Sequence, residues 1–465
     1  MVVWLMAGCA GAQAQSLPGP LAQAFRSAGQ PVEEISLAAV PVAGGPALLS
    51  VNARQALNPA STMKLLTSYA ALGVLGPDYR WKTLGLLRGS MAGDVLEGDL
   101  VLKGGGDPKL VIEDLTAWIG TMRQAGLREI RGDLVIDDSI YDVDDRSVEQ
   151  FDGDPSQPYN VRPFAMLMNF KATRFVVTPA GGDLYVSLDP PLADVAMDID
   201  IGIARGKCRY GASGLLIRIR GTDARPLIRI SGSYSPACGE QSTFAAVLTH
   251  RQFIEGLFKA AWRTAGGKWD GRARIEPGSA KAAKLWIEWN SPRTLSDVVQ
   301  DINKFSNNVM TRQVLLQIAA AGSEQPATPE RARASLYGWL KLQGLEFPEL
   351  VLDNGSGLSR SERISAASMT RLLVHAAASP YADLMRTSLP KVGIDGTMKN
   401  RLVGEPLVGN AFIKTGSLND VRAIAGYIDA ASGRRYAVAL LINGPRAELS
   451  QGAQDAFLRW VYTNG

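Results

Sequence analysis

A block of short strand-like runs interrupts a chain that otherwise mixes helical and extended segments, and this interruption limits the folds open to it. Between residues 171 and 235, apolar and polar residues alternate in short runs such as 174–177 and 216–220, separated by proline and glycine. This pattern is typical of β-strands joined by turns. An insertion between two halves of one domain explains the order best, and tandem independent domains are the alternative.

The segments on either side of the block are predicted from their periodicity and their boundary residues. Before it, we expect a helix at 20–28, strands at 35–40 and 47–51, and an apolar-rich helix that ends at Leu75. After it, we expect helices at 295–303, 307–321, 330–343, 366–377 and 451–462, and strands at 410–414, 422–428 and 436–442.

Size and composition exclude several classes of protein. The 465 residues are enough for two or three domains, and 46% hydrophobic with 20% charged residues excludes disorder, collagen and coiled coil. The net charge is +4 and the basic residues are scattered, which argues against a nucleic-acid partner. Beyond the N-terminal residues no apolar run reaches 18, so no internal membrane span is expected.

The N-terminal residues 1–14 are typical of the end of a secretory signal peptide. An apolar stretch is followed by Ala-Gln-Ala at 12–14, a small-x-small cleavage pattern. A basic region before the apolar stretch is missing, so the true start codon stays open, and a lipoprotein anchored at Cys9 is the alternative. In an exported chain, Cys208 and Cys238 form a disulfide or remain two unpaired thiols.

Only two histidines occur, His250 and His375, and neither has Cys, Asp or Glu at metal-ligand spacing. The sequence therefore predicts no metal site. It also argues against zinc peptidases and most Ser-His-Asp hydrolases, so any hydrolase chemistry here needs another base.

A serine precedes a lysine by three residues at Ser61 and Lys64, where Asn-Pro predicts the start of a helix. This spacing puts both side chains on one helix face. The helix N-terminus and partial burial lower the pKa of Lys64, and a neutral lysine can take the serine proton. The motif is weak alone. A second copy, at Ser388 and Lys391, precedes poor helix material and is predicted to be a loop.

A second motif, Ser306-Asn-Asn308, lies between two predicted helices. The Ser306 hydroxyl could relay a proton to a leaving group, and the Asn308 amide could bond a substrate amide. The alternative is that Ser306 only caps the following helix.

A third motif, Lys414-Thr415-Gly416-Ser417, ends a predicted strand. Lysine and threonine can bind a carboxylate, and glycine permits a close approach to the backbone. The backbone N–H groups of Ser417 and Ser61 could form an oxyanion hole. An exposed hairpin turn is the alternative.

In this order on helix, loop and strand, the three motifs resemble those of the penicillin-recognising serine acyltransferases. The long insertion between the first two resembles the class C low-molecular-mass penicillin-binding proteins, which are D-alanyl-D-alanine carboxypeptidases and endopeptidases. Further stretches match the same family: 104–108, 132–135 with 138–139, 353–360, and 388–390 with 395–397.

The resemblance implies an α/β (α+β) fold, a β-lactamase-like domain with a large β-rich insertion. The implied divisions are a catalytic domain at 17–85 and 288–465, an inserted domain at 86–160 and 215–287, and a smaller β-rich domain at 161–214. It also implies a periplasmic enzyme that acts on peptidoglycan stem peptides and cross-links without a cofactor and is covalently inhibited by β-lactams.

The resemblance assigns Ser61 as the acylated nucleophile and Lys64 as its base, with Ser306 and Asn308 aiding proton transfer and holding the peptide. Lys414 and its neighbours through Ser417 would bind the substrate, with the carboxylate on Lys414 and Thr415 and the peptide lying beside the strand at Gly416.

The positions that would contact a diaminopimelate side chain are Asp154, Tyr159 and Arg360. Asp154 precedes Pro155 and is alternatively a plain turn residue. No glutamate motif of the class A β-lactamases follows Ser61 at short range, so a β-lactam adduct is expected to persist. The competing functions are a non-catalytic muropeptide-binding protein and a β-lactamase or esterase of the same fold.

Overall fold

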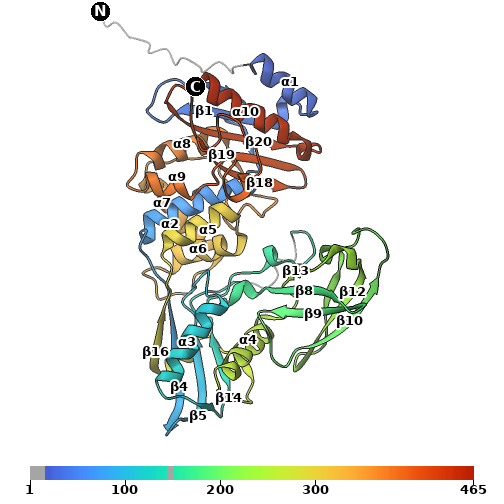
Figure 1. The fold of residues 1–465 in the computed structure, drawn as a ribbon. Coiled ribbons are helices and arrows are strands. Elements are labelled where there is room, and N and C mark those ends of the chain that lie inside the picture. Colours follow the sequence, from blue (N-terminus) through green and yellow to red (C-terminus); the bar gives the residue numbers. More distant parts are fainter. Residues whose placement is uncertain (1–15, 144–150) are drawn as a thin grey trace, which may run out of the picture.

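The computed structural model describes residues 16–143 and 151–465, and the chain is organised in three lobes (Figure 1). The split lobe, residues 16–81 and 291–465, contains both ends of the described chain. The inserted lobe, residues 82–143 and 246–290, extends from it. The strand lobe, residues 173–245, projects from the side of the inserted lobe. The predicted signal peptide and Cys9 lie outside the described residues.

The split lobe is built on one antiparallel sheet that joins the two ends of the chain. The strand order is β18 (Ala411–Leu418), β19 (Val421–Asp429), β20 (Arg435–Asn443), β1 (Ile35–Pro41) and β2 (Leu49–Val51). Because β1 pairs with β20, residues before the insertion complete a sheet formed mostly after it. A single domain interrupted by an insertion therefore describes the chain better than tandem domains.

Both faces of this sheet are covered by helices, since successive strand residues point to opposite faces. In β20, Val438, Leu440 and Ile442 face one core, and Ala439 and Leu441 face the other. The first core includes α1 (Gly19–Ser27) and α10 (Gln451–Asn464). The second includes α2 (Lys64–Leu75), α5 (Leu295–Phe305), α6 (Asn308–Ala320), α7 (Pro329–Leu342), α8 (Ala366–Ala377) and α9 (Ala382–Ser388).

The inserted lobe contains a seven-stranded mixed sheet with two helices against it. Its strands are β4 (Lys82–Ala92), β5 (Val95–Lys103), β6 (Glu129–Ile130), β7 (Leu134–Asp137), β14 (Lys268–Trp269), β15 (Ala273–Ile275) and β16 (Lys284–Asn290), and its helices are α3 (Ile112–Gln124) and α4 (His250–Thr264). The first and last strands pair antiparallel with Lys82 opposite Asn290. The chain therefore leaves and re-enters the split lobe at adjacent positions.

The strand lobe contains two three-stranded sheets and one disulfide, between Cys208 and Cys238. The strands are β8 (Thr173–Ala180), β9 (Asp183–Asp189), β10 (Ala196–Ile203), β11 (Leu216–Thr222), β12 (Arg225–Tyr234) and β13 (Gln241–Ala245). The predicted boundary at residue 214 falls between β10 and β11, inside this group. The two sheets run on to Ala245 because β13 pairs with β8.

Candidate active site

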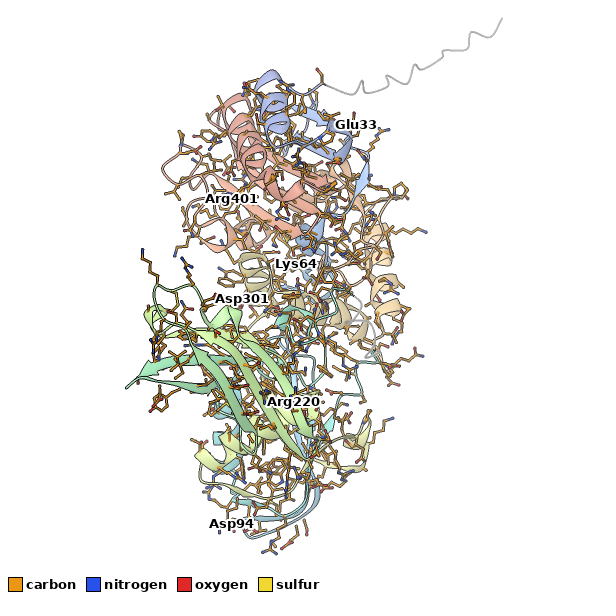
Figure 2. All side chains as sticks on the ribbon, turned by 90° about the vertical axis from the view of Figure 1, so that its right-hand side faces the viewer. Glu33, Lys64, Asp94, Arg220, Asp301 and Arg401 are labelled. Atoms are coloured by element: carbon orange, nitrogen blue, oxygen red, sulfur yellow. A yellow bond between two sulfur atoms is a disulfide. The ribbon has the colours of Figure 1, made fainter. Side chains whose placement is uncertain are left out.

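The three sequence motifs meet in the split lobe, on the side that faces the insertion, where Figure 2 labels Lys64. The 3-10 turn Ala60–Met63, which continues into α2, supplies Ser61 and Lys64. The turn between α5 and α6 supplies Ser306, the first residue of α6 is Asn308, and the edge strand β18 supplies Lys414 to Ser417. A helix start, an interhelical turn and a strand edge thus converge from positions far apart in the sequence.

Lys64 lies at the centre of this arrangement. Its Nζ lies 3.0 Å from Oγ of Ser61, donates a hydrogen bond of 2.6 Å to Oδ1 of Asn308, and donates another to the carbonyl oxygen of Ser356. The lysine is fully buried, whereas Ser61 is partly exposed. The amine therefore lies behind the hydroxyl, which itself stays open to a ligand.

Burial lowers the pKa of Lys64 well below its ordinary value, and the positive charges of Lys414 and Arg312 lower it further. The carboxylate of Glu362 acts in the opposite direction. Removing an ammonium group from water penalises its charged form, so burial favours the neutral amine. This is the protonation state that a general base requires.

Ser306 ends α5 in a left-handed conformation, with φ of 58°. Its Oγ accepts a hydrogen bond of 2.8 Å from Nζ of Lys414. The helix that follows is capped by Asn307, whose Oδ1 accepts from the backbone N–H of Met310. The alternative in which Ser306 merely caps this helix is therefore wrong, and its hydroxyl instead lies in the site.

Lys414 is buried completely, and burial lowers its pKa to about 7. Its Nζ also donates to the carbonyl oxygen of Thr415, at 2.7 Å. The Thr415 hydroxyl is partly exposed and donates to Oγ1 of Thr397, at 2.8 Å. An ammonium group with hydroxyls beside it is suited to binding a carboxylate.

Position 416 must be glycine because the backbone of β18 lies very close there to the backbone of the turn that carries Ser61. A Cβ at this position would lie 2.8 Å from the carbonyl oxygen of Pro59 and 2.9 Å from the backbone nitrogen of Ser61. Any larger residue would separate β18 from the turn that carries Ser61. Gly416 thus brings the third motif against the first, a packing role beyond the room for substrate that the sequence predicts.

Asn58 was not among the predicted site residues, although it fixes the same turn. Its Oδ1 accepts from the backbone N–H of Ala60 at 2.9 Å, and its Nδ2 donates to the carbonyl oxygen of Ser359 at 2.8 Å. Asparagine before a helical turn is a known capping signal. In the sequence, the same asparagine predicts only where the helix begins.

Glu362 is a second residue that sequence analysis missed. Its carboxylate is fully buried and accepts hydrogen bonds from the backbone N–H groups of Gly355 and Gly357. The two glycines flank Ser356, whose carbonyl oxygen contacts Lys64. Nothing in the local sequence distinguishes Glu362 from a surface glutamate.

The three positions predicted to contact diaminopimelate each have other partners here. The Asp154 carboxylate accepts from the backbone and side chain of Ser156 and lines a cavity of about 940 Å³ between the inserted and strand lobes. The Tyr159 hydroxyl donates to Asp152. Arg360 pairs with Asp420 at 2.9 Å and lies over the ring of Phe151.

Arg312 connects the Tyr159 segment to the catalytic elements. It lies one turn after Asn308 on α6, and its guanidinium donates to the carbonyl oxygens of Tyr159 and Val161. Arg312 therefore joins residues 159–161, which belong to the insertion, to the helix that carries Asn308.

The second Ser-x-x-Lys motif, at Ser388 and Lys391, lies in different surroundings from the first. Ser388 is the last residue of α9, where a loop was predicted, and its buried hydroxyl donates to the carbonyl oxygen of Met385. Lys391 lies over the ring of Phe412. The Ser388 hydroxyl therefore already donates a hydrogen bond within its own helix.

Within residues 16–143 and 151–465, no group of three or more His, Cys, Asp or Glu side chains is arranged to hold a metal ion. In the same part of the chain, no helix is both long and apolar enough to cross a membrane.

Comparison with known proteins finds relatives that are named D-alanyl-D-alanine carboxypeptidases. A D-alanyl-D-alanine carboxypeptidase of an Actinomadura species is 29% identical over 446 residues, 90% of this chain and 79% of that relative. D-alanyl-D-alanine carboxypeptidase DacB of Haemophilus influenzae is 26% identical over 406 residues, 83% of this chain and 80% of its own.

The fold matches as well. The crystal structure of penicillin binding protein 4 from Haemophilus influenzae superposes with a TM-score of 0.79 at 22% identity, covering 96% of this chain and 100% of that one. The same protein complexed with a β-lactam superposes with a TM-score of 0.75.

The family match defines the class of the chain as a hydrolase, a serine peptidase. It belongs to the D-Ala-D-Ala carboxypeptidase 3 (S13) family, whose model matches residues 21–463.

Proposed function

We propose that this enzyme hydrolyses D-Ala-D-Ala termini and D-alanyl cross-links of peptidoglycan through an acyl-enzyme on Ser61. The observation that carries the proposal is the 3.0 Å contact between Oγ of Ser61 and the buried Nζ of Lys64. A partly exposed hydroxyl beside an amine of lowered pKa is an activated nucleophile. A non-catalytic binding protein would not need this pair.

The partners of Lys64 orient its lone pair. A neutral amine has two N–H bonds and one lone pair, and both the Asn308 amide oxygen and the Ser356 carbonyl oxygen can only accept. When these two take the N–H bonds, the lone pair is left for the Ser61 proton. The proton passes to Nζ as Oγ bonds to the substrate carbonyl carbon. As the C–N bond breaks, the proton held on Nζ of Lys64 passes to the departing amine by way of Ser306. A water molecule then attacks the acyl carbon, and Oγ of Ser61 leaves and regains its proton.

The terminal carboxylate would bind at Lys414 and Thr415. Lys414 is buried behind Ser306, and Thr415 is partly exposed beside it. Such a pair holds a D-alanine carboxylate next to the bond that Ser61 attacks, and the backbone N–H groups of Ser61 and Ser417 would stabilise the oxyanion. Binding an anion favours the charged form of Lys414, so substrate itself raises the pKa of this lysine.

The endopeptidase activity and the periplasmic location belong to the same proposal. A D-alanyl-diaminopimelate cross-link presents a larger leaving group, for which Asp154, Tyr159 and Arg360 are the proposed contacts. Arg360 is the best placed, because it is exposed and directly follows Ser359, whose carbonyl oxygen accepts from Asn58 beside the turn that carries Ser61. The expected signal peptide would carry the enzyme to this substrate.

The test is intact-protein mass spectrometry after incubation with benzylpenicillin, with wild type compared with Ser61→Ala. We expect one stable penicilloyl adduct on the wild type and none on the variant. No adduct on folded wild type would favour a muropeptide-binding protein, and an adduct lost within seconds would favour a β-lactamase. Digestion of cross-linked muropeptide dimers by wild type and Arg360→Ala then separates the endopeptidase from the carboxypeptidase activity.

A further inference from the structure

We propose that Glu362 is a positioning residue, which holds the loop 353–357 so that the carbonyl oxygen of Ser356 orients the amine of Lys64. This inference rests on the proposed function, because it concerns how Lys64 is made ready to take the Ser61 proton.

The Glu362 carboxylate holds the loop through three backbone N–H groups. Oε1 accepts from Gly355 at 2.7 Å and from Asp353 at 3.2 Å, and Oε2 accepts from Gly357 at 2.9 Å. Both oxygens are therefore used as acceptors. An ionised carboxylate fits this arrangement, whereas a carboxamide or a protonated acid has a hydrogen where Gly355 or Gly357 already donates.

The backbone conformation of the loop 353–357 is tightly constrained where it contacts Lys64. Gly355 and Gly357 have φ of 70° and 79°, which glycine tolerates and other residues rarely adopt. A Cβ on Gly357 would lie 1.8 Å from the carbonyl oxygen of Ala60. The loop backbone thus passes directly against the turn that carries Ser61.

Two residues of α2 meet this loop. The Thr67 hydroxyl donates to the carbonyl oxygen of Gly355 at 2.8 Å, and Nζ of Lys64 donates to that of Ser356. With Asn308, the Ser356 carbonyl occupies both N–H bonds of the neutral amine. If Glu362 released the loop, that amine could rotate and its lone pair would no longer point at Ser61.

Glu362 and Lys64 also influence each other through their charges. The charged groups that face Glu362 are Lys64 from α2, Arg312 from α6 and Asp353 from the loop itself. Burial raises the pKa of Glu362 to about 7, against the opposing effect of the backbone N–H groups. Its negative charge in turn raises the pKa of Lys64. Loss of this charge should therefore lower the pH at which Lys64 becomes neutral.

The experiment measures the rate of acylation by nitrocefin against pH for wild type, Glu362→Gln and Glu362→Asp. The matched control is Glu349→Gln, because Glu349 also accepts from a backbone N–H, that of Ser365, and lies outside the site. Thermal unfolding of each variant shows that it is folded.

We expect Glu362→Gln to lower the plateau rate by about tenfold or more, since general-base catalysis depends on this geometry. The midpoint of its rising limb should also move to lower pH. Glu362→Asp keeps the charge, so it should keep the wild-type midpoint at a reduced rate. Glu349→Gln should resemble wild type in both respects.

The inference is overturned if folded Glu362→Gln acylates at the wild-type rate, or if both Glu362 variants are slowed with the midpoint unchanged, as expected for a merely structural residue. If Glu362→Gln does not fold, the Glu362→Asp profile decides, because a wild-type rate in that shorter acid would equally refute positioning. Failure of wild type to acylate would instead refute the proposed function.

Discussion

Nζ of Lys414 donates a hydrogen bond of 2.8 Å to Oγ of Ser306, although one residue lies on a strand and the other ends a helix 108 residues earlier. The left-handed conformation of Ser306 aims its hydroxyl at the strand. The contact joins a proposed proton relay to a proposed carboxylate site. In the proposed mechanism, this contact would couple carboxylate binding to leaving-group protonation through Lys414.

The charge on Lys414 should set an alkaline limit to activity. The pKa of Lys414 is lowered to about 7 in the free enzyme, so kcat/KM for a D-Ala-D-Ala peptide should fall as pH rises through that value. Lys414→Arg keeps its charge throughout this range, so it should remove the alkaline limb at some cost in rate. Initial rates from pH 5 to pH 10 measure this, and a limb unchanged in the variant would contradict it.

The same lysine should make stability depend on pH. Its pKa is about 7 when folded and about 10.4 when unfolded, so the unfolded chain binds more protons between these values. The free energy of unfolding should therefore rise with pH in that window, by about 1 kcal/mol per pH unit from this group.

In Lys414→Met the side chain cannot titrate. The part of the pH dependence of the unfolding free energy that comes from Lys414 should therefore vanish in this variant. Urea unfolding at pH 7, 8 and 9 provides the measurement. Lys64 also has a lowered pKa, so a residual positive slope is expected. Equal slopes in wild type and variant would show that Lys414 titrates normally.

Gly416→Ala should separate β18 from the turn that carries Ser61. The added Cβ would meet the Pro59 carbonyl oxygen at 2.8 Å, and a displacement of this kind costs about 1–3 kcal/mol. Acylation by benzylpenicillin should slow by at least about tenfold, because catalytic geometry tolerates little displacement.

The matched control for this variant is Gly338→Ala in α7, where an added Cβ meets nothing within 4 Å. That variant should acylate normally and gain about 0.5–1 kcal/mol in helix stability. Similar acylation rates for the two variants would refute the packing role of Gly416.

Loss of the disulfide should destabilise the strand lobe alone. The Cys208–Cys238 bond closes a loop of 30 residues within that lobe, and such a closure stabilises by about 3–4 kcal/mol in the chain-entropy model. The double variant Cys208→Ser with Cys238→Ser should expose residues 173–245 to limited proteolysis. The rate of acylation at Ser61 should remain that of wild type, and a parallel loss of acylation would show that the lobes are coupled.

The sequence predicted the split lobe well because its elements follow a clear period. The strand at 436–442 and the helix at 366–377 both appear within one residue of their expected bounds. By contrast, the sequence predicts no bounds for α3 and α4, which lie on either side of the strand-like block at 171–235. Their apolar faces pack on the sheet of the inserted lobe, a partner that local pattern does not reveal.

The residues of the candidate site likewise divide into those that the sequence predicted and those that it missed. Ser61, Lys64, Ser306, Asn308 and Lys414 come together as their motifs predicted, because each motif is short and rigid in its own element. Glu362 and Arg312 could not be found this way. Arg312 bonds to the backbone of a distant segment and Glu362 to that of the loop just before it, and a backbone partner leaves no mark on the sequence.

The pairing of Lys82 with Asn290 has a consequence for how this enzyme can be rebuilt. The entropy of closing a loop depends weakly on its length and mainly on bringing its ends together. Because the insertion leaves and re-enters the split lobe at paired residues, a hairpin turn could connect the same two ends. Splicing a short turn between these two strands should leave a minimal enzyme that retains all three motifs. It would lose the partners of Arg312 at residues 159–161, so any acylation it retained would show that the three motifs assemble without the insertion.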